Sequence, residues 1–543
     1  MMFFRLYRKE LVLVFVSAVL ASLPFHSPRF APLAWIALVP LFACLDRLKN
    51  RNEAFRFGYI WGVFFFGMTL YWVWYVAVIG YITLALYLGV FGGLFGFFAY
   101  RSVTVLANSG SPHFRHGWIN VFTLAALWVL VEYARLRAPV LGFPWVLWGY
   151  TQWRNIPFIQ TADHWGAWGV SFTLVAANAA LYGIFAAVRR VFKYELSLGG
   201  VVAQVALMSV LGGGLAAASV VYGNEALKTF GTDSTVPPRK IAVVQGNIPQ
   251  HEKWDAGIKD MIFQKYDGLS RQTALERPEL VIWPETAFPG YWEDEPPMQA
   301  RFQALARSVN ARFLIGSPTL VYEDGVEKHM NTALYFGPRG ERLGAYHKLR
   351  LVPFGEYVPF FGFLRRFFEI GRFSPGRRMV LFSLPAAQPD QKNVLLAVLI
   401  CFEDIFPDLC RNLTARGCRL LVNITNDAWF LKSSAPYQHA QASVFRAVEN
   451  RVNVVRVANT GLSSWIDPAG RVRDTVQDKG EELFVTGIRV WNVPIDADSP
   501  RTFYGVWGDF FVVLAAVYFA LTYPLYRLPH NLVRAAEVSD EDE

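Results

Sequence analysis

Cysteine is scarce in this sequence, which has four among its 543 residues: Cys44, Cys401, Cys410 and Cys418. They form no CxxC pair and do not have the spacing of zinc ligands, so the sequence predicts neither a metal site nor a disulfide framework. A bridge between Cys410 and Cys418 stays open if the compartment is oxidising. Walker-type and GxGxxG loops are missing from the polar part of the chain, so no nucleotide cofactor is expected.

Charged residues are also few. They make up 17% of the chain, whereas 53% is hydrophobic and 16% is aromatic. A chain of this length and composition is too long for one domain and too apolar for an ordinary soluble protein. The formal net charge is +9, but no basic run with interleaved aromatics occurs, so nucleic-acid binding is not expected. The positive residues lie beside apolar segments instead, which is typical of a membrane protein.

Eight apolar stretches are long enough to be membrane spans, seven before a polar block and one after it. They lie at residues 11–25, 31–45, 58–78, 82–100, 118–134, 168–187, 200–222 and 505–526. Lys and Arg accumulate on alternate loops, which the positive-inside rule makes cytoplasmic, although Arg135, Arg137 and Arg154 conflict with this bias. Seven spans then place the polar block outside the cytoplasm. The predicted parts are a transmembrane bundle at 1–223, an outer catalytic block at 224–499, a final span at 500–528 and a cytoplasmic tail at 529–543.

Short apolar strands alternate with polar or amphipathic helical stretches in the outer block. The predicted strands lie at 240–245, 280–283, 313–316, 332–336, 394–400 and 420–424. This alternation predicts one α/β domain with helices covering its sheets. The functional residues of such a domain are expected at strand ends.

Three of these strand ends carry reactive side chains. Glu285 closely follows the strand at 280–283, Lys348 follows a strand that ends two residues earlier, and Cys401 follows the apolar strand at 394–400. Such a set can perform acyl transfer: the carboxylate takes the thiol proton, the thiolate attacks a carbonyl, and the ammonium group with a backbone N–H holds the oxyanion. Taken singly, each residue has a plainer interpretation, with Cys401 as a small core residue and the other two as solvated surface residues.

Four motifs occur in an order and spacing that resemble a known superfamily. They are WPETAFP (283–289), HKLRLVPFGEYVPF (347–360), ICFEDIFPD (400–408) and NITNDAWF (423–430). Together they resemble the Glu-Lys-Cys signature of the nitrilase superfamily. The preceding spans, with GFPW (142–145) and QGNIPQHEKWD (245–255), narrow the resemblance to the apolipoprotein N-acyltransferase family over essentially the whole chain. The implied fold is a multi-pass α-helical membrane domain of about eight spans with an extracytoplasmic α/β domain like the nitrilase αββα sandwich.

The resemblance also implies roles for seven residues. Cys401 matches the nucleophile, Glu285 the general base and Lys348 the oxyanion stabiliser, while Glu356, Glu403, Trp254 and Phe402 match supporting or substrate-binding positions. Phe402 stands where the family usually has Tyr, so its ring is expected to pack without the hydrogen bond of a hydroxyl group. Leu431 and Ala435 stand where glycine is common, which predicts a different backbone path for that loop.

The reaction implied by the resemblance passes through a thioester. Cys401 would take the sn-1 acyl chain of a phospholipid such as phosphatidylethanolamine, and the amine of a diacylglyceryl-cysteine at a lipoprotein N-terminus would then accept it. No metal or diffusible cofactor is required, because the thioester stores the acyl group. We expect a monomer in the bacterial inner membrane, with its catalytic domain on the periplasmic side.

Three alternatives stay open at this point. A membrane-anchored amidase or nitrilase could use the same residues with water as the acceptor and a small C–N compound as the substrate. A related acyltransferase could use another acceptor amine. A transporter or scaffold with an inactive outer domain is disfavoured by the complete set of Glu285, Lys348 and Cys401.

Overall fold

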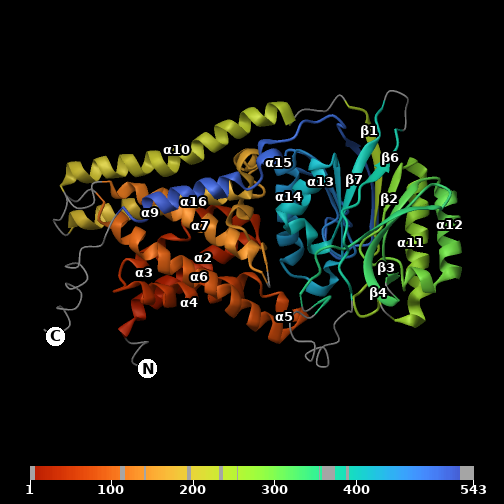
Figure 1. Ribbon diagram of the computed structural model, residues 1–543, viewed down its shortest axis with the longest axis horizontal. Helices are drawn as coiled ribbons and strands as arrows, with labels where there is room; N and C mark the ends of the chain where they lie inside the picture. Colours follow the sequence, from red (N-terminus) through yellow and green to blue (C-terminus); the bar gives the residue numbers. More distant parts are fainter. Residues whose placement is uncertain are drawn as a thin grey trace. The chain divides into compact units, whose positions relative to one another are not determined.

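The computed structural model describes residues 6–109, 116–139, 142–192, 197–230, 236–253, 255–323, 325–353, 355–357, 373–386 and 391–525. The chain divides into two compact units. The helical unit comprises Met1–Lys228 and Trp507–Glu543, and the α/β unit comprises Thr229–Val506. Figure 1 shows both, with the N-terminal helices in red to yellow and the α/β unit mainly in green to blue.

The helical unit is built from apolar helices. In chain order these are α2 Arg8–His26, η1 Pro28–Trp35, α3 Val39–Leu45, α4 Arg51–Thr69, α5 Val73–Val76, α6 Val78–Ala107, η2 Gly117–Ile119, α7 Asn120–Arg137, η3 Trp148–Gln152, α8 Ile156–Ile159, α9 Ala162–Phe192, α10 Leu198–Phe230 and, near the C-terminus, α16 Phe510–Thr522. Among the described residues, six helical segments are long and apolar enough to cross a membrane: α2, Pro28–Leu45, α6, Gly117–Arg137, α9 and α10. They correspond to six of the eight predicted spans.

The other two predicted spans are weaker in the structure. The stretch 58–78 corresponds to α4, whose first turns carry Arg51, Glu53 and Arg56. The stretch 505–526 corresponds mainly to α16, which has 13 residues and is shorter than the about 20 residues that a helix needs to cross the hydrocarbon core. The number of spans is therefore approximate.

Glycines let α4 and α6 approach each other closely. A Cβ atom at Gly58 would lie 2.4 Å from the carbonyl oxygen of Gly92, and one at Gly96 would lie 2.3 Å from the carbonyl oxygen of Ala54. Any larger side chain would force the two helices apart, which is the usual reason for small residues between membrane helices.

Two of the three arginines that conflict with the charge bias, Arg135 and Arg137, are engaged inside the helical unit. Arg135 is buried and donates hydrogen bonds to the backbone carbonyls of Phe143, Trp145 and Val146. Arg137 forms an ion pair with Asp509 at 3.2 Å. These contacts anchor the GFPW stretch, so Arg135 and Arg137 have structural partners and are poor indicators of topology.

The α/β unit contains twelve strands among its described residues, arranged in two six-stranded sheets. They are β1 Pro238–Gln245, β2 Leu280–Ile282, β3 Arg312–Glu323, β4 Val326–Phe336, β5 Arg342–His347, β6 Phe382–Leu384, β7 Val394–Ile400, β8 Leu420–Thr425, β9 Asn453–Ala458, β10 Ser464–Ile466, β11 Val472–Thr475 and β12 Gly487–Pro494. Its main helices are α11 Lys259–Thr273, α12 Pro296–Val309, α13 Pro407–Ala415 and α14 Ala435–Asn450, and α15 Phe503–Trp507 follows β12. All six predicted strands are present.

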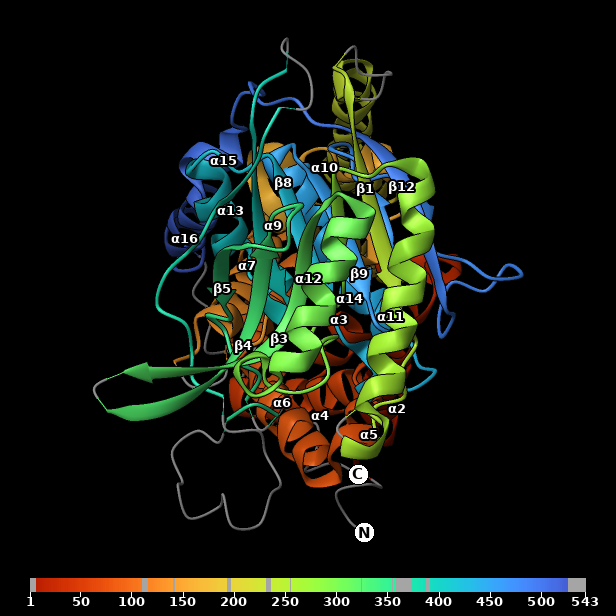
Figure 2. The same cartoon turned by 90° about the vertical axis from the view of Figure 1, so that its right-hand side faces the viewer.

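The two sheets have matching topologies. The strand orders are β12-β1-β2-β3-β4-β5 and β11-β10-β9-β8-β7-β6. In each sheet the central three strands, β1-β2-β3 and β7-β8-β9, are parallel and the outer strands are antiparallel. Helices α11 and α12 cover the first sheet (Figure 2), and α13 and α14 lie on the side of the second sheet away from them. This is the layering implied by the resemblance, so the predicted fold class is confirmed.

Each sheet is buried on both faces, which explains the continuous apolar runs in the sequence. In β1, Ile241 and Val243 enter the core between the sheets, whereas Ala242 and Val244 pack with the α11 and α12 helices. Successive side chains of a strand point to opposite faces, so a strand inside a four-layer sandwich is apolar at most positions. The reactive residues of the candidate site lie just beyond strand ends.

Candidate active site

The structure brings the three predicted reactive residues together. Glu285 follows β2, Lys348 follows β5 and Cys401 follows β7. Lys348 is 1% exposed, Glu285 is 7% exposed, and Cys401 is half-buried. The Glu285 carboxylate raises the pKa of the Cys401 thiol and the Lys348 ammonium group lowers it.

Lys348 lies between two carboxylates. Its Nζ atom is 2.9 Å from Oε1 of Glu356 and 3.3 Å from Oε1 of Glu285. The side-chain amide of Asn331 donates to the same two oxygens, at 2.8 Å in each case. Burial alone lowers the pKa of Lys348, but the carboxylates of Glu356 and Glu285 outweigh burial and raise the pKa above its usual range. The lysine therefore carries a positive charge at neutral pH.

Cys401 occupies a strained turn. Its φ is 55°, and Thr286, directly after Glu285, has a φ of 47°. Residues other than glycine avoid this left-handed region, and such strain is concentrated at functional sites. Burial and the Glu285 carboxylate raise the pKa of the Cys401 thiol well above its usual value, while Lys348 lowers it. Cys401 is therefore a thiol at neutral pH and would need a base in order to react as a thiolate.

Glu403 joins the turn at Cys401 to the segment after Lys348. The fully buried carboxylate accepts hydrogen bonds from the Tyr346 hydroxyl (2.9 Å) and from the backbone N–H groups of Leu349 (2.7 Å), Arg350 (3.0 Å) and Ile400 (2.8 Å). Burial raises the pKa of Glu403 to about 7, against the effect of these donors. The side chain fixes the turn at Cys401 and the segment after Lys348 relative to each other.

Three further positions were singled out in the sequence: Phe402, Trp254 and Leu431. Phe402 is 6% exposed, and its ring packs edge-to-face on Phe406 with centroids 5.0 Å apart, so the ring packs as expected. Trp254 lies outside the described residues. Leu431 has φ 50° and ψ −160°, a backbone conformation that strongly favours glycine.

The other cysteines are separate from the site. Cys410 and Cys418 are both buried free thiols, as is Cys44. Burial raises the pKa of Cys418 to about 12, which keeps this thiol protonated and unreactive. The bridge that the sequence left open is not formed.

Two polar residues of the site were missed by reasoning from the sequence. Asn331 lies in the middle of β4, just before the apolar stretch 332–336, where no strand end marks it. Lys253 is 5% exposed and donates to the backbone carbonyl of Glu285 at 2.8 Å. Burial lowers the pKa of Lys253 to about 8, although Glu285 and Cys401 oppose this effect. The only signal for Lys253 was its place beside Trp254 in the motif at 245–255.

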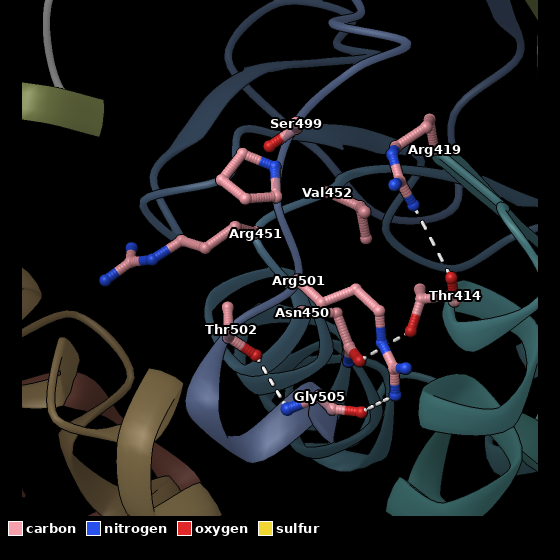
Figure 3. Close-up of a pocket in the computed structure, with 10 residues that line it drawn as sticks. Thr414, Arg419, Asn450, Arg451, Val452, Ser499, Arg501, Thr502 and Gly505 are labelled. Atoms are coloured by element: carbon pink, nitrogen blue, oxygen red, sulfur yellow. Dashed lines mark hydrogen bonds between the residues drawn. The ribbon is translucent and has the colours of Figure 1, made fainter. Parts of the chain in front are cut away.

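Two other kinds of ligand site, a metal site and an anion site among arginines, were looked for in the part of the chain that the structure describes. No group of three or more His, Cys, Asp or Glu side chains there could hold a metal ion. A cavity of about 10 Å³ is lined by Arg419, Arg451 and Arg501 among others, but Figure 3 shows Arg451 extending away from the other two. Each of the three donates to backbone carbonyls, so they do not form a converging anion site.

Comparison with known proteins covers both units. Residues 17–180 match the model of the apolipoprotein N-acyltransferase N-terminal domain, and residues 240–492 match the carbon-nitrogen hydrolase model. The apolipoprotein N-acyltransferase of Geobacter metallireducens is 37% identical over 96% of this chain and 97% of its own length. That of Rickettsia bellii is 30% identical over 94% of this chain and 96% of its own. A solved amidase from Nesterenkonia sp. is 20% identical and covers 48% of this chain and 94% of its own, with a TM-score of 0.36. Because these relatives match almost the whole chain at 30–37% identity, this chain belongs to the apolipoprotein N-acyltransferase family.

Proposed function

We propose that this protein is a membrane N-acyltransferase that moves the sn-1 acyl chain of a phospholipid to the N-terminal amine of a diacylglyceryl-cysteine on an apolipoprotein. Family membership and the apolar helices support the substrate class, because both substrates are anchored in lipid. The observation that carries the chemistry is the positively charged Lys348, held between Glu285 and Glu356 and within electrostatic range of the Cys401 thiol.

In the first step Glu285 takes the proton from the Cys401 thiol as Sγ attacks the ester carbonyl. The carbonyl oxygen becomes negative and is stabilised by the Lys348 ammonium group together with a backbone N–H. The C–O bond to glycerol then breaks, Glu285 returns the proton to the glycerol oxygen, and the lysophospholipid leaves. The acyl chain remains on Cys401 as a thioester.

In the second step the neutral α-amine of the diacylglyceryl-cysteine attacks the thioester. Glu285 accepts a proton from the amine, the tetrahedral oxyanion is held as before, and the C–S bond breaks. The sulfur regains its proton, and the product is an amide. An amine competes with water here, so exclusion of water from the thioester distinguishes this enzyme from an amidase.

The supporting residues act through the first three. Glu356 and Asn331 orient Lys348 and Glu285 through the contacts described above. Glu403 fixes the segment after Lys348 against the turn of Cys401. Phe402 contributes its ring to packing, and Trp254 is assigned to substrate binding on the family resemblance alone.

We further propose that the protein is a monomer in the bacterial inner membrane, with the α/β unit on the periplasmic side and phosphatidylethanolamine as the acyl donor. Labelling of a single cysteine introduced on the surface of the α/β unit, with a reagent that does not cross the membrane, tests the orientation in intact spheroplasts. Labelling only after lysis would contradict it.

The function is tested by intact-mass spectrometry of the full-length protein incubated with phosphatidylethanolamine. We expect a hydroxylamine-labile acyl adduct that is discharged by a diacylglyceryl peptide amine, with Cys401→Ser and Glu285→Ala as inactive controls. Well-folded protein that forms no adduct, yet hydrolyses a small amide, would favour the amidase alternative.

A further inference from the structure

A closed polar cluster lies next to Cys401, on the side of the turn that faces α14. It consists of Asp404, Asp427, His439, Ser443 and Arg456, and each of these residues is 0% exposed. Arg456 donates to Oδ2 of Asp404 at 2.7 Å, and the Ser443 hydroxyl donates to the same oxygen. Two carboxylates and one guanidinium group leave a net negative charge, which is costly in a dry interior unless it is balanced.

His439 supplies the balancing charge. Its Nδ1 is 3.1 Å from Oδ1 of Asp427, and its Nε2 is 2.9 Å from Oδ1 of Asp404. Burial lowers the pKa of His439, but Asp404 and the hydrogen bonds to both carboxylates outweigh burial and raise the pKa to about 9. The ring is therefore an imidazolium at neutral pH and donates from both nitrogens.

The same imidazolium reaches the nucleophile. Nε2 of His439 is 3.2 Å from the backbone carbonyl oxygen of Cys401, so its one N–H is shared between this oxygen and Oδ1 of Asp404. The side-chain amide of Asn423 donates to this oxygen as well, at 2.8 Å. The carbonyl of the strained residue is therefore held by two donors from separate elements, α14 and β8.

Fixing this carbonyl also fixes the following N–H. The peptide that joins Cys401 to Phe402 is trans, because the described residues contain no cis peptide bond. In a planar trans peptide the C=O and N–H groups point in opposite directions. With the carbonyl of Cys401 directed at His439 and Asn423, the N–H of Phe402 is directed to the opposite side of the turn.

We propose that His439 is a positioning residue for acyl transfer, which together with Asn423 holds the Cys401 carbonyl and so aims the Phe402 N–H at the oxyanion. This inference rests on the proposed function, in which Cys401 is the nucleophile. His439 does not touch the substrate; it acts through the peptide plane between Cys401 and Phe402. Loss of one such oxyanion donor costs about 10²- to 10³-fold in rate, and its misorientation costs a part of that.

The test compares two reactions of Cys401 in the full-length protein. Acylation by a p-nitrophenyl fatty-acyl ester passes through an oxyanion, whereas alkylation by iodoacetamide does not. We expect His439→Gln to slow acylation by about 10- to 100-fold while alkylation stays within about 2-fold of wild type. Ser443→Ala is the matched control, because it removes buried hydrogen bonds to Asp404 and from Arg456 without touching the Cys401 carbonyl, and both rates should stay near wild type.

Asn423→Ala is a second variant at the same carbonyl, for use if His439→Gln fails to fold. It should also slow acylation while the rate of alkylation stays near wild type. Unchanged acylation in folded variants, or acylation and alkylation that fall together, overturns the proposal. The ester probe needs neither phospholipid nor lipoprotein. If the wild-type protein is acylated by the ester but never by a phospholipid, the proposed function is overturned. The role of His439 can still be tested with the ester in that case.

Discussion

Separate replacement of Glu285 and Lys348 should move the pKa of Cys401 in opposite directions while both replacements stop acyl transfer. Burial and the Glu285 carboxylate raise the pKa of this thiol, and the Lys348 ammonium group lowers it. Glu285→Gln removes a like charge, so the thiolate should form at lower pH. Lys348→Met removes an opposite charge, so the thiolate should form at higher pH. A charge within about 4–6 Å of a titratable group shifts its pKa by about one to three units.

Turnover should fall in both variants for different reasons. Without the Glu285 carboxylate no base takes the thiol proton, which costs about 10²- to 10⁴-fold. Without the Lys348 ammonium group the oxyanion loses its positive partner, which costs about 10²- to 10³-fold. The Glu285→Gln variant is the sharper case, because it should ionise more easily than wild type and still react more slowly.

Two assays on the full-length protein measure these effects. The rate of alkylation by iodoacetamide, followed from about pH 6 to pH 11, gives the ionisation midpoint of Cys401. Cys44, Cys410 and Cys418 are buried, and Cys401→Ser gives the background from them. Acyl-adduct formation from phosphatidylethanolamine gives the transfer rate. Midpoints that move in the same direction, or wild-type acylation by Glu285→Gln, would refute the reasoning.

Three further predictions concern stability and backbone geometry. The pKa of His439 rises from 6.5 to about 9 on folding. Protonation of His439 therefore stabilises the folded state by on the order of 3 kcal/mol. This contribution is complete below about pH 6.5 and is lost as the pH rises through about 9. The difference in melting temperature between wild type and His439→Gln should therefore narrow between about pH 6 and pH 10, and a constant difference contradicts this. Leu431→Gly should raise the melting temperature by about 2–4 °C, because it relieves strain at an exposed residue at the cost of some entropy; a lower melting temperature counts against strain there. Gly316→Ala should slow acylation, because its Cβ atom would lie 2.3 Å from the carbonyl oxygen of Pro284 and displace Glu285; acylation at the wild-type rate would show that the loop accommodates the methyl group without moving Glu285.

The class of the fold and the meeting of the three reactive residues could be predicted because both depend on local patterns. An apolar run such as 394–400 indicates a buried strand by itself, and parallel strands bring their ends to one edge. The predicted strand at 332–336 is only the second half of β4, which begins at Val326. The first half carries charged residues and extends beyond the apolar core, so hydrophobicity did not reveal it.

Asn331 and His439 were missed because no sequence pattern marks them. Asn331 lies inside a strand, and His439 lies inside α14, where neither position is marked by a strand end or a turn. Their importance comes from partners that are distant in the sequence: Asn331 joins Glu285 to Glu356, and His439 lies between Asp404 and Asp427. The charge balance of a buried cluster can be worked out only when all its members are known.

The backbone conformation of Cys401 shows the same limit most clearly. Thr286 and Cys401 have φ values of 47° and 55°, where local preference favours glycine. Glycine at Cys401 would relieve the strain but remove the thiol, so tertiary contacts have to hold a side chain there against the preference of its backbone. The carboxylate of Glu403 holds the N–H before the turn, and His439 and Asn423 hold the carbonyl within it. The position of Cys401 is a local property of the strand that precedes it, whereas its reactive geometry depends on residues that only the folded chain brings together.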